Sequence, residues 1–369
     1  MQPNYITKET QRSMSTINFF AGPAILAQEV LQEAKQGIEN FKGMGLSILE
    51  ISHRSKQFIE VLEEAEARVR NLLNVSDDYG VLFLTGGASS QFYMTAMNLL
   101  NEDESAGYLD TGAWSSKAIK EAQLFGNIEM VASSKDKNYA YIPKGFAIDP
   151  NFKYLHFTSN NTIYGTQFKD FPATDRRLVC DMSSDIFSRP IDVNRFDIIY
   201  AGAQKNMGPS GTTLVIVKKD ILNKVNRSLP SMLNYQTHID KGSSFNTPPV
   251  YAIYVSMLSL RWLENNGGLL AMQKRNEDKA ALLYNEIDRN SLFVGSAAKE
   301  DRSLMNVCFL PKNEEDTPKF IAKATEAGCV GIGGHRSVGG FRASIYNAMP
   351  IEGVQKLVDV MQQFEKDNG

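Results

Sequence analysis

The amino-acid sequence predicts an α/β protein with a mostly parallel, seven-stranded sheet and a smaller α/β domain after it. The first observation is that short apolar runs between residues 81 and 217 alternate with helical or turn segments. The second is that an apolar helical pattern over residues 249–264 ends at Gly267 and Gly268, after which a new pattern begins. A chain of 369 residues is also long enough for two domains.

Two helices precede the sheet, because residues 27–41 and 56–73 carry apolar side chains at helical spacing. The seven apolar runs that we assign to strands cover residues 81–84, 106–109, 128–131, 154–158, 178–181, 197–201 and 213–217. In the C-terminal part we expect a helix, two strands and two closing helices, at residues 269–288, 305–309, 341–344, 318–327 and 351–366.

The chain therefore divides into three parts. Residues 1–16 form an N-terminal extension that we expect to be disordered. Residues 17–268 form the large domain, whose first residues could pack on the small domain. Residues 269–369 form that small C-terminal domain.

The composition excludes several classes of protein. A net charge of −3 with 22% charged residues gives no overall attraction to nucleic acid. The three cysteines, Cys180, Cys308 and Cys329, lie far apart, which argues against a disulfide framework and a metal site. No apolar run is long enough to span a membrane, and the first sixteen residues lack the apolar core of a signal peptide. We therefore expect a cytoplasmic protein.

One lysine stands out, because it lies in a Gly- and Pro-rich turn between two predicted strands. Lys205 occupies the stretch Ala201-Gly-Ala-Gln-Lys-Asn-Met-Gly-Pro-Ser-Gly211. At the end of a core strand, desolvation lowers the pKa of a lysine and frees its amine for Schiff-base chemistry. The alternative is an ordinary solvated turn lysine.

An aspartate ends the strand that precedes this turn. Asp181 closes the run Arg177-Leu-Val-Cys-Asp181, at the strand end where α/β sheets bind ligands. A carboxylate there can pair with the protonated nitrogen of a pyridine cofactor while the lysine holds the aldehyde of that cofactor. Lys205 and Asp181 fit these two roles.

A phosphate site is predicted where Leu82-Phe-Leu-Thr-Gly-Gly87-Ala-Ser-Ser runs from a strand into a helix. The first backbone N–H groups of such a helix point at the strand end and bind anions. A simple tight turn is the alternative, and no P-loop motif is present. Trp114, at a predicted helix start, could stack on a cofactor ring or belong to the core. The segment Asn160-Asn-Thr162 offers further polar groups after a strand.

Arginines next to histidines suggest a substrate with several negative charges. Two of the four histidines precede an arginine, in Ser52-His53-Arg54 and Gly334-His335-Arg336, and Arg342 lies close to the second pair. Single pairs of this kind are usually surface residues. Nearby glycines allow a close approach, however, and guanidinium groups bind carboxylate and phosphate in bidentate fashion. A phosphorylated acid would satisfy such a set.

With these motifs the chain resembles the phosphoserine aminotransferases, which are pyridoxal-phosphate enzymes of fold type I. The resemblance extends from Asn18 to the C-terminus. The strings that carry it are Phe20-Ala-Gly-Pro-Ala24, Ser52-His-Arg54, Asp181-Met-Ser-Ser184, Ser188-Arg-Pro-Ile-Asp192, Tyr200-Ala-Gly-Ala-Gln-Lys-Asn206, Phe245-Asn-Thr-Pro-Pro249, Gly334-His-Arg336 and Arg342-Ala-Ser-Ile-Tyr-Asn-Ala348.

The resemblance implies a role for each candidate residue. Lys205 would form a Schiff base with pyridoxal 5′-phosphate, and Asp181 would pair with its ring nitrogen. Trp114 would stack on the ring, and Thr162 would donate to the oxygen of the ring hydroxyl. Five residues would hold the cofactor phosphate, the last two from the partner subunit of a homodimer with shared active sites: Ala88, Ser89, Gln204, Asn246 and Thr247. The substrate anions would bind His53, Arg54, His335, Arg336 and Arg342.

The reaction implied is transfer of the amino group of L-glutamate to 3-phosphohydroxypyruvate, which gives O-phospho-L-serine for serine biosynthesis. The same anion-binding groups could accept the phosphorylated keto acid of pyridoxine biosynthesis. One residue departs from the family pattern, because many relatives have arginine where this chain has Ser89. The rival functions are an alanine–glyoxylate aminotransferase, a cysteine desulfurase, and a non-catalytic protein that binds a phosphorylated ligand.

Overall fold

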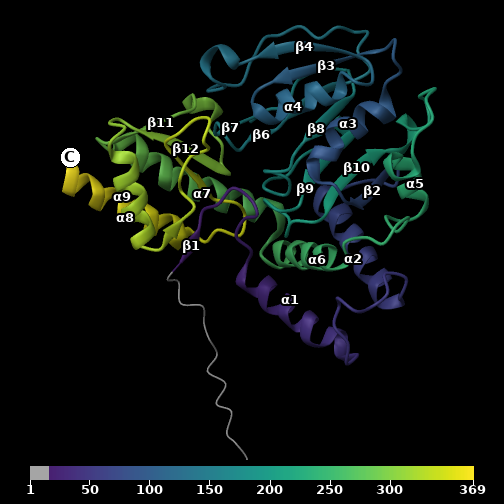
Figure 1. The fold of residues 1–369 in the computed structure, drawn as a ribbon, viewed down its shortest axis with the longest axis horizontal. Helices are drawn as coiled ribbons and strands as arrows, with labels where there is room; N and C mark the ends of the chain where they lie inside the picture. Colours follow the sequence, from purple (N-terminus) through teal and green to yellow (C-terminus); the bar gives the residue numbers. More distant parts are fainter. Residues whose placement is uncertain (1–15) are drawn as a thin grey trace, which may run out of the picture.

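A computed structural model describes residues 16–369, so most of the predicted N-terminal extension lies outside the described residues. Its main feature is a seven-stranded sheet in the order β2-β10-β9-β8-β5-β3-β4 (Figure 1). The strands are β2 (Tyr79–Leu84), β3 (Ser105–Asp110), β4 (Asn127–Ser133), β5 (Leu155–Thr158), β8 (Leu178–Asp181), β9 (Ile198–Gly202) and β10 (Thr213–Lys218). Only β10 runs antiparallel to its neighbours in this sheet, which confirms the predicted mostly parallel topology.

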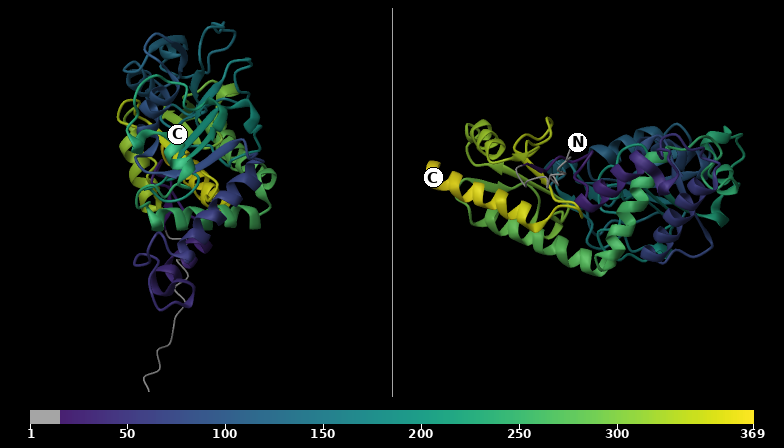
Figure 2. Two further views of the ribbon diagram at one scale, coloured as in Figure 1. Left: turned by 90° about the vertical axis from the view of Figure 1, so that its right-hand side faces the viewer. Right: turned by 90° about the horizontal axis from the view of Figure 1, so that it is seen from below.

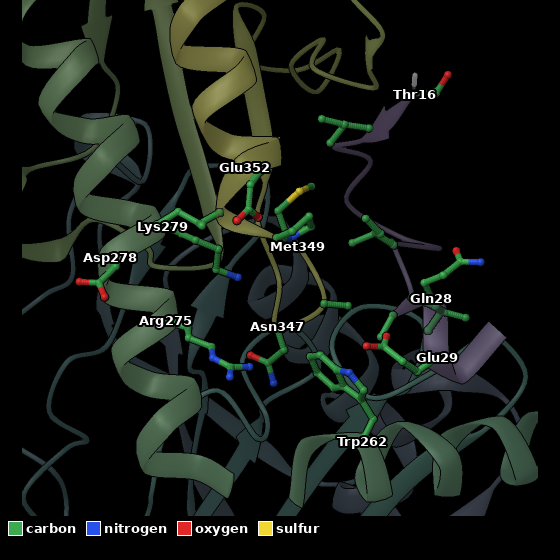
Figure 3. A pocket seen from close by; sticks show the side chains of 17 residues that line it. Thr16, Gln28, Glu29, Trp262, Arg275, Asp278, Lys279, Asn347, Met349 and Glu352 are labelled. Atoms are coloured by element: carbon green, nitrogen blue, oxygen red, sulfur yellow. The ribbon is translucent and has the colours of Figure 1, made fainter. Parts of the chain in front are cut away.

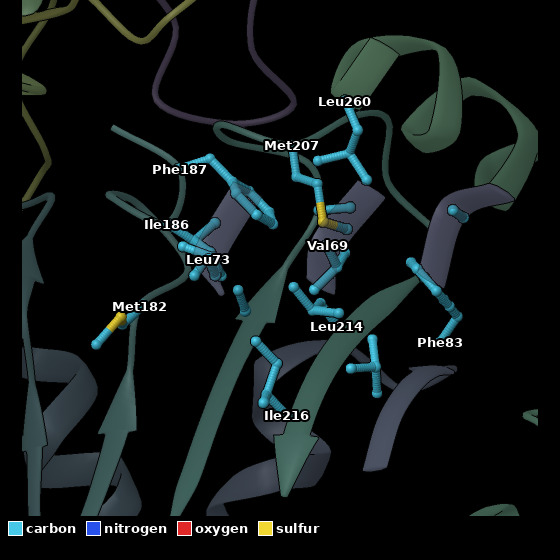
Figure 4. Packing of buried hydrophobic residues seen from close by; sticks show 14 of the residues in the cluster. Val69, Leu73, Phe83, Met182, Ile186, Phe187, Met207, Leu214, Ile216 and Leu260 are labelled. Carbon is cyan, nitrogen blue, oxygen red and sulfur yellow. The ribbon is translucent and has the colours of Figure 1, made fainter. Parts of the chain in front are cut away.

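Alternate side chains of each strand enter two hydrophobic clusters, one on each face of the sheet. In β2, Val81 and Phe83 pack in the first cluster, whereas Leu82 and Leu84 pack in the second. The first face is covered by α1 (Gln28–Asn40), α2 (Lys56–Leu73) and α6 (Val250–Asn265). Figure 4 shows residues of α2 and α6 around β10. The second face is covered by α3 (Gly87–Leu99), α4 (Ala113–Ala122) and α5 (Tyr235–Asp240).

The C-terminal part has its own sheet and core. Strands β11 (Phe293–Gly295), β12 (Asn306–Pro311) and β14 (Phe341–Ser344) form an antiparallel sheet in that order. Three helices accompany it: α7 (Gly268–Arg289), α8 (Asp316–Glu326) and α9 (Ile351–Asn368). The long helices α7 and α9 run side by side (Figure 2). A third hydrophobic cluster joins this sheet to these helices.

The beginning of the described chain packs on this C-terminal part. Strand β1 (Ile17–Asn18) pairs in parallel with β13 (Cys329–Val330). Ile17 and Phe19 are buried in the same cluster as the C-terminal helices. The chain then passes to α1 in the other part, so residues 19–27 connect the two. The domain boundary near Gly268 stays a prediction, which the separate clusters support.

The predicted elements are close to those observed. Every predicted strand and helix has a counterpart whose ends differ by no more than a few residues, and α2 and β8 have the predicted bounds. No sequence pattern predicted the short strands β1, β11 and β13, or the β6–β7 hairpin (Asn160–Asn161 and Thr166–Gln167). Among the described residues, no helix is both long and apolar enough to cross a bilayer.

Candidate active site

The candidate residues meet because five strands end at one edge of the sheet. Strands β2, β9, β8, β5 and β3 all point the same way, since β10 is antiparallel to both β2 and β9. The residues that follow or end these strands therefore share the carboxyl edge, where α/β sheets bind ligands. They include the Gly86–Gly87 turn, Lys205, Asp181, Thr162 and Trp114, in the order of those strands.

Lys205 lies in the turn between β9 and β10, with its side chain half-buried. Its Nζ is 5.4 Å from the centroid of the Trp114 ring. Burial lowers the pKa of Lys205, and this effect exceeds the opposing pull of the Asp181 carboxylate. Gly22 packs against the side chain of Lys205, so that a Cβ added to Gly22 would lie 3.2 Å from Lys205 Cγ. The amine is thus desolvated, as nucleophilic lysines require.

The carboxylate of Asp181 is buried, and hydroxyl and amide donors fix its orientation. Its Oδ1 accepts hydrogen bonds from the backbone N–H of Ser183 at 2.9 Å and from the Ser183 hydroxyl at 2.6 Å. Its Oδ2 has no partner among the residues that the structure describes. Burial raises the pKa of Asp181, whereas Lys205 and these two hydrogen bonds lower it. One carboxylate oxygen therefore remains available for a cationic ligand atom.

Trp114 and Thr162 are joined across the opening of the site. The indole Nε1 of Trp114 donates to the Thr162 hydroxyl at 3.1 Å. The Thr162 oxygen therefore acts as an acceptor here, which leaves its own O–H free to donate to a ligand. Trp114 is half-buried in the first turn of α4, and the amines of Lys117 and Lys205 lie 4.5 Å and 5.4 Å from the centroid of its ring. This is the position that a stacking indole needs.

The N-terminus of α3 has free backbone donors. Gly86 is the N-cap residue, with φ of 95°, and no side chain caps the helix. Gly86 lies so close to the first turn of α3 that a Cβ on this residue would be 1.9 Å from Ser90 Oγ. The N–H groups of Ala88 and Ser89 in this first turn therefore have no side-chain partner, and the helix terminus favours an anion. The Ser89 side chain is exposed.

The other residues assigned to the cofactor phosphate lie on two further loops. Gln204 precedes the lysine, and its backbone carbonyl accepts a hydrogen bond from Ala24 N–H at 2.9 Å. Asn246 lines a cavity of about 150 Å³ together with Gly86 and Ser90 of the same chain. The Asn246 side chain is half-buried and donates to the backbone carbonyl of Thr247 at 3.1 Å.

Three of the five predicted substrate residues gather beside this edge. Arg342 donates through Nη1 to the backbone carbonyl of Thr162 at 3.0 Å, while its buried Nε has no partner. Partial burial lowers the pKa of His335, and the charges of Arg342 and Arg336 lower it further. Arg342 also lowers the pKa of Lys205, so this positive field reaches the lysine. An anion placed here would supply the missing countercharge.

His53 and Arg54 do not join this group within one chain. They belong to residues 44–55, between the 3₁₀ turn that follows α1 and the start of α2. That segment lies at the far end of α1, away from the C-terminal part (Figures 1 and 2). The prediction that all five residues face one substrate is thus not met by a single copy of the chain.

Sequence reasoning missed several residues of the site. Lys117 lies one helical turn after Trp114, with its Nζ 4.5 Å from the centroid of that ring, and its charge also lowers the pKa of His335. The spacing of three residues on a helix was the available signal. In β5 and β9, the strands on either side of the one that ends at Asp181, the buried His156 Nε2 forms a hydrogen bond with the Tyr200 hydroxyl at 2.8 Å. Neither residue shows a pattern that separates it from the core.

These groups match the chemistry of pyridoxal 5′-phosphate. The open N-terminus of α3 suits a phosphate, the free Oδ2 of Asp181 suits a protonated ring nitrogen, and the Thr162 hydroxyl suits a ring oxygen. Lys205 supplies an amine for the aldehyde. Within residues 16–369, no three histidine, cysteine or acidic side chains are placed to hold a metal ion.

Comparison with known proteins agrees with this geometry. The aminotransferase class-V family model matches residues 16–357. The chain is similar to a phosphoserine aminotransferase of Parabacteroides distasonis, at 58% identity over 96% of this chain and 100% of the relative. It is also similar to the phosphoserine aminotransferase of Flavobacterium johnsoniae, at 57% identity over 95% of this chain and 99% of the relative.

Solved structures give the same result. A phosphoserine aminotransferase structure described by radiation damage of its Schiff base matches with a TM-score of 0.93 and 50% identity, covering 95% of this chain and 99% of that one. The phosphoserine aminotransferase of Trichomonas vaginalis with bound PLP matches with a TM-score of 0.90 and 36% identity, over 94% of this chain and 99% of that one. The chain belongs to the phosphoserine aminotransferases of aminotransferase class V.

Proposed function

We propose that this chain is a pyridoxal-phosphate-dependent aminotransferase that moves the amino group of L-glutamate to 3-phosphohydroxypyruvate. The products would be O-phospho-L-serine, for serine biosynthesis, and 2-oxoglutarate. The observation that carries the proposal is the shared edge at which Lys205, Asp181 and Trp114 lie beside His335 and the cations of Arg336 and Arg342. The names of the full-length relatives support the same activity.

The cofactor, when bound, supplies an aldehyde that accepts amino groups and a ring that stores electrons. Asp181 would hold a proton at the ring nitrogen, oriented by its bonds to Ser183. Lys205 would move the proton at the α-carbon of each substrate, because burial lowers the pKa of its amine and so favours the uncharged form. The first-turn N–H groups of Ala88 and Ser89 would hold the phosphate, and without an arginine at Ser89 these donors carry more of that work.

A homodimer would complete the site. We propose that Asn246 and Thr247 reach the phosphate of the partner's cofactor, and that Gln204 holds it from within the same chain. The loop between α1 and α2 that carries His53 and Arg54 lies away from the C-terminal part (Figure 1), so we assign these two residues to the site of the second copy. The substrate's phosphate and carboxylate would then be bound by residues of both copies, together with Arg336 and Arg342.

The rival functions fit less well. A cysteine desulfurase needs a reactive thiolate, but burial raises the pKa of the Cys308 thiol to about 12 and holds the pKa of the Cys180 thiol well above its ordinary value. An alanine–glyoxylate aminotransferase of Nostoc shares the fold, with a TM-score of 0.75 at 14% identity. The substrates in the name of that enzyme carry no phosphate. An enzyme with such substrates would not need the cations of Arg336 and Arg342 for a phosphate group. A non-catalytic binding protein would not need a desolvated lysine opposite Asp181.

The test is the visible absorbance of the purified protein. Adding glutamate should remove the yellow band, and 3-phosphohydroxypyruvate should restore it, whereas pyruvate and glyoxylate should not. A yellow protein whose absorbance does not change on addition of glutamate would favour one of the rival enzymes. A protein that stays colourless after addition of the cofactor, and that borohydride does not label at Lys205, would overturn the assignment of that lysine.

Two extensions of this proposal follow from the same residues. The phosphorylated keto acid of pyridoxine biosynthesis carries the same kinds of anion, so we propose it as a second substrate, checked by the same absorbance test. We also propose that the enzyme works in the cytoplasm, where phosphorylated metabolites of this kind are found; fractionation of cells would test this.

A further inference from the structure

A cavity of about 600 Å³, whose lining residues do not include Lys205, lies between the C-terminal part and the chain that enters α1 (Figure 3). Its walls come from α7, from the loop that leads into α9, and from the first turn of α1. Cavities of this volume commonly hold small ligands. The polar side chains in its walls indicate which ligand it would bind.

The first indication is a buried lysine without a counterion. Lys279 of α7 is only 2% exposed, and it points into the cavity in Figure 3. Its Nζ donates to the backbone carbonyls of Ile345 at 3.0 Å and Tyr346 at 2.7 Å. An ammonium group has three donors, and the third has no partner among the described residues. Burial without an acidic partner disfavours the charged form of this amine, so a bound anion would stabilise that form.

A second cation lies one turn earlier on the same helix. Arg275 also lines the cavity, makes no ion pair with any described carboxylate, and donates only to Asn266 Oδ1 at 3.2 Å. Burial and the charge of Arg275 together lower the pKa of Lys279 to about 7. Neither cation is paired with a described carboxylate, since Asp278, which also lines the cavity, pairs with Lys274. A ligand carboxylate here would reduce the repulsion between the two cations and favour the charged form of Lys279.

The remaining walls carry acids and apolar groups. Glu352, in the first turn of α9, and Glu29, in the first turn of α1, line the same cavity and form no ion pair within residues 16–369. Trp262 and Met349 add apolar surface between them. A phosphate dianion would be repelled by these carboxylates, whereas an ammonium group would be attracted. The cavity therefore offers cations, acids and an apolar wall to one ligand.

We propose that this cavity binds a small free amino acid with an apolar side chain. Its carboxylate contacts Lys279 and Arg275, its ammonium faces Glu352 and Glu29, and its side chain packs on Trp262. Lys205 does not line this cavity, although a smaller cavity that Lys205 lines shares Trp262 and Asn347 with it. The proposal does not depend on the proposed function.

Calorimetric titration of the holoenzyme with L-leucine tests this. We expect millimolar or tighter binding without a change in the visible absorbance, which would report the cofactor site. 4-Methylpentanoate, which lacks the ammonium, and 3-methylbutylamine, which lacks the carboxylate, should each bind at least about tenfold more weakly, because each loses a charge-assisted contact. Failure of L-leucine to bind, or equal binding of all three compounds, would overturn the proposal.

Variants locate the binding. Arg275→Gln and Glu352→Gln should each weaken L-leucine about tenfold or more. Lys366→Gln is the matched control, because it removes one charge from the exposed end of α9, outside the cavity. Binding near pH 7.5 should also take up protons, since a carboxylate favours the charged form of Lys279, and buffers of different ionisation enthalpy measure this uptake. Unchanged affinity in both cavity variants would show that L-leucine binds elsewhere.

Discussion

Trp114 and Thr162 come from elements 48 residues apart and meet through one hydrogen bond, in which the indole Nε1 donates to the threonine hydroxyl at 3.1 Å. The bond ties the first turn of α4 to the segment after β6. It fixes the plane of the indole and, at the same time, turns the threonine O–H toward the site. The Thr162 hydroxyl thus orients the indole of Trp114 and directs its own O–H into the site.

Thr162→Val should therefore remove two interactions with almost no change in volume. Two hydrogen bonds at about 1 kcal/mol each correspond to a fall of about tenfold or more in kcat/KM for 3-phosphohydroxypyruvate. Steady-state kinetics measure this, and the fluorescence of Trp114 should change with it. Thr162→Ser is the control, because it keeps the hydroxyl. If the valine variant were as active as the serine variant, the hydroxyl would have no role.

Asp181→Asn should increase stability and reduce activity. Burial raises the pKa of this carboxyl in the folded chain, so the folded state holds the proton more tightly than the unfolded state. Stability is then lost as pH rises from the unfolded pKa through the folded one, and the ionised carboxylate remains a cost at pH 7. The amide removes that cost and also removes the charge that pairs with a ring nitrogen.

We expect the apo form of Asp181→Asn to melt at a higher temperature than the native sequence at pH 8, by about 1 °C for each kcal/mol of stability gained. The gain should shrink as pH falls toward 4. Activity of the holoenzyme should drop roughly 100-fold. Ser183→Ala serves for comparison, because it removes one donor to the carboxylate and keeps the charge. A variant that is less stable at every pH would refute the electrostatic argument.

His156 should make the fold sensitive to acid. Burial lowers the pKa of its imidazole from 6.5 to about 3, so between these values the unfolded chain binds a proton that the folded chain does not. Stability therefore falls as pH drops from 6.5 toward 3. Between pH 7.5 and pH 5, this residue alone accounts for a loss of about 2 kcal/mol.

His156→Gln should remove that part of the loss, as measured by urea unfolding of the apo-protein at the two pH values. Tyr200→Phe keeps the imidazole and should keep the dependence on pH, although it removes the 2.8 Å bond to His156 Nε2. An identical dependence in the native sequence and in His156→Gln would assign the acid sensitivity to other groups.

Gly86→Ala should weaken binding of pyridoxal 5′-phosphate. A Cβ at this position would lie 1.9 Å from Ser90 Oγ, which would displace the first turn of α3. We expect the dissociation constant for the cofactor, measured by absorbance titration of the apo-protein, to rise about tenfold or more. Gly43→Ala is a matched control, because Gly43 also has a positive φ, of 75°, but no atom within 4 Å of the added Cβ. That variant should lose stability without losing cofactor affinity.

The sequence predicted the sheet and the edge of the site because both follow from short-range patterns. Apolar runs mark the strands, and polar residues such as Asp181 and Lys205 follow where those runs end. The pairing of β1 with β13 involves two residues on each side, separated by about three hundred residues, and so leaves no periodic signal. The dipeptide His53-Arg54 likewise says nothing about which copy of the chain it would face, since that depends on how α1 projects from the sheet.

The chain between β1 and α1 gives the molecule a mechanical property. Strand β1 is fastened to the C-terminal part, α1 to the sheet part, and Gly22 passes within contact of Lys205 on the way. The two parts are therefore joined at two points, here and at the junction of α6 with α7. A tilt of the C-terminal part would therefore shift the segment around Gly22 relative to the side chain of Lys205. The covalent chain thus couples the orientation of the C-terminal part to the shape of the candidate active site.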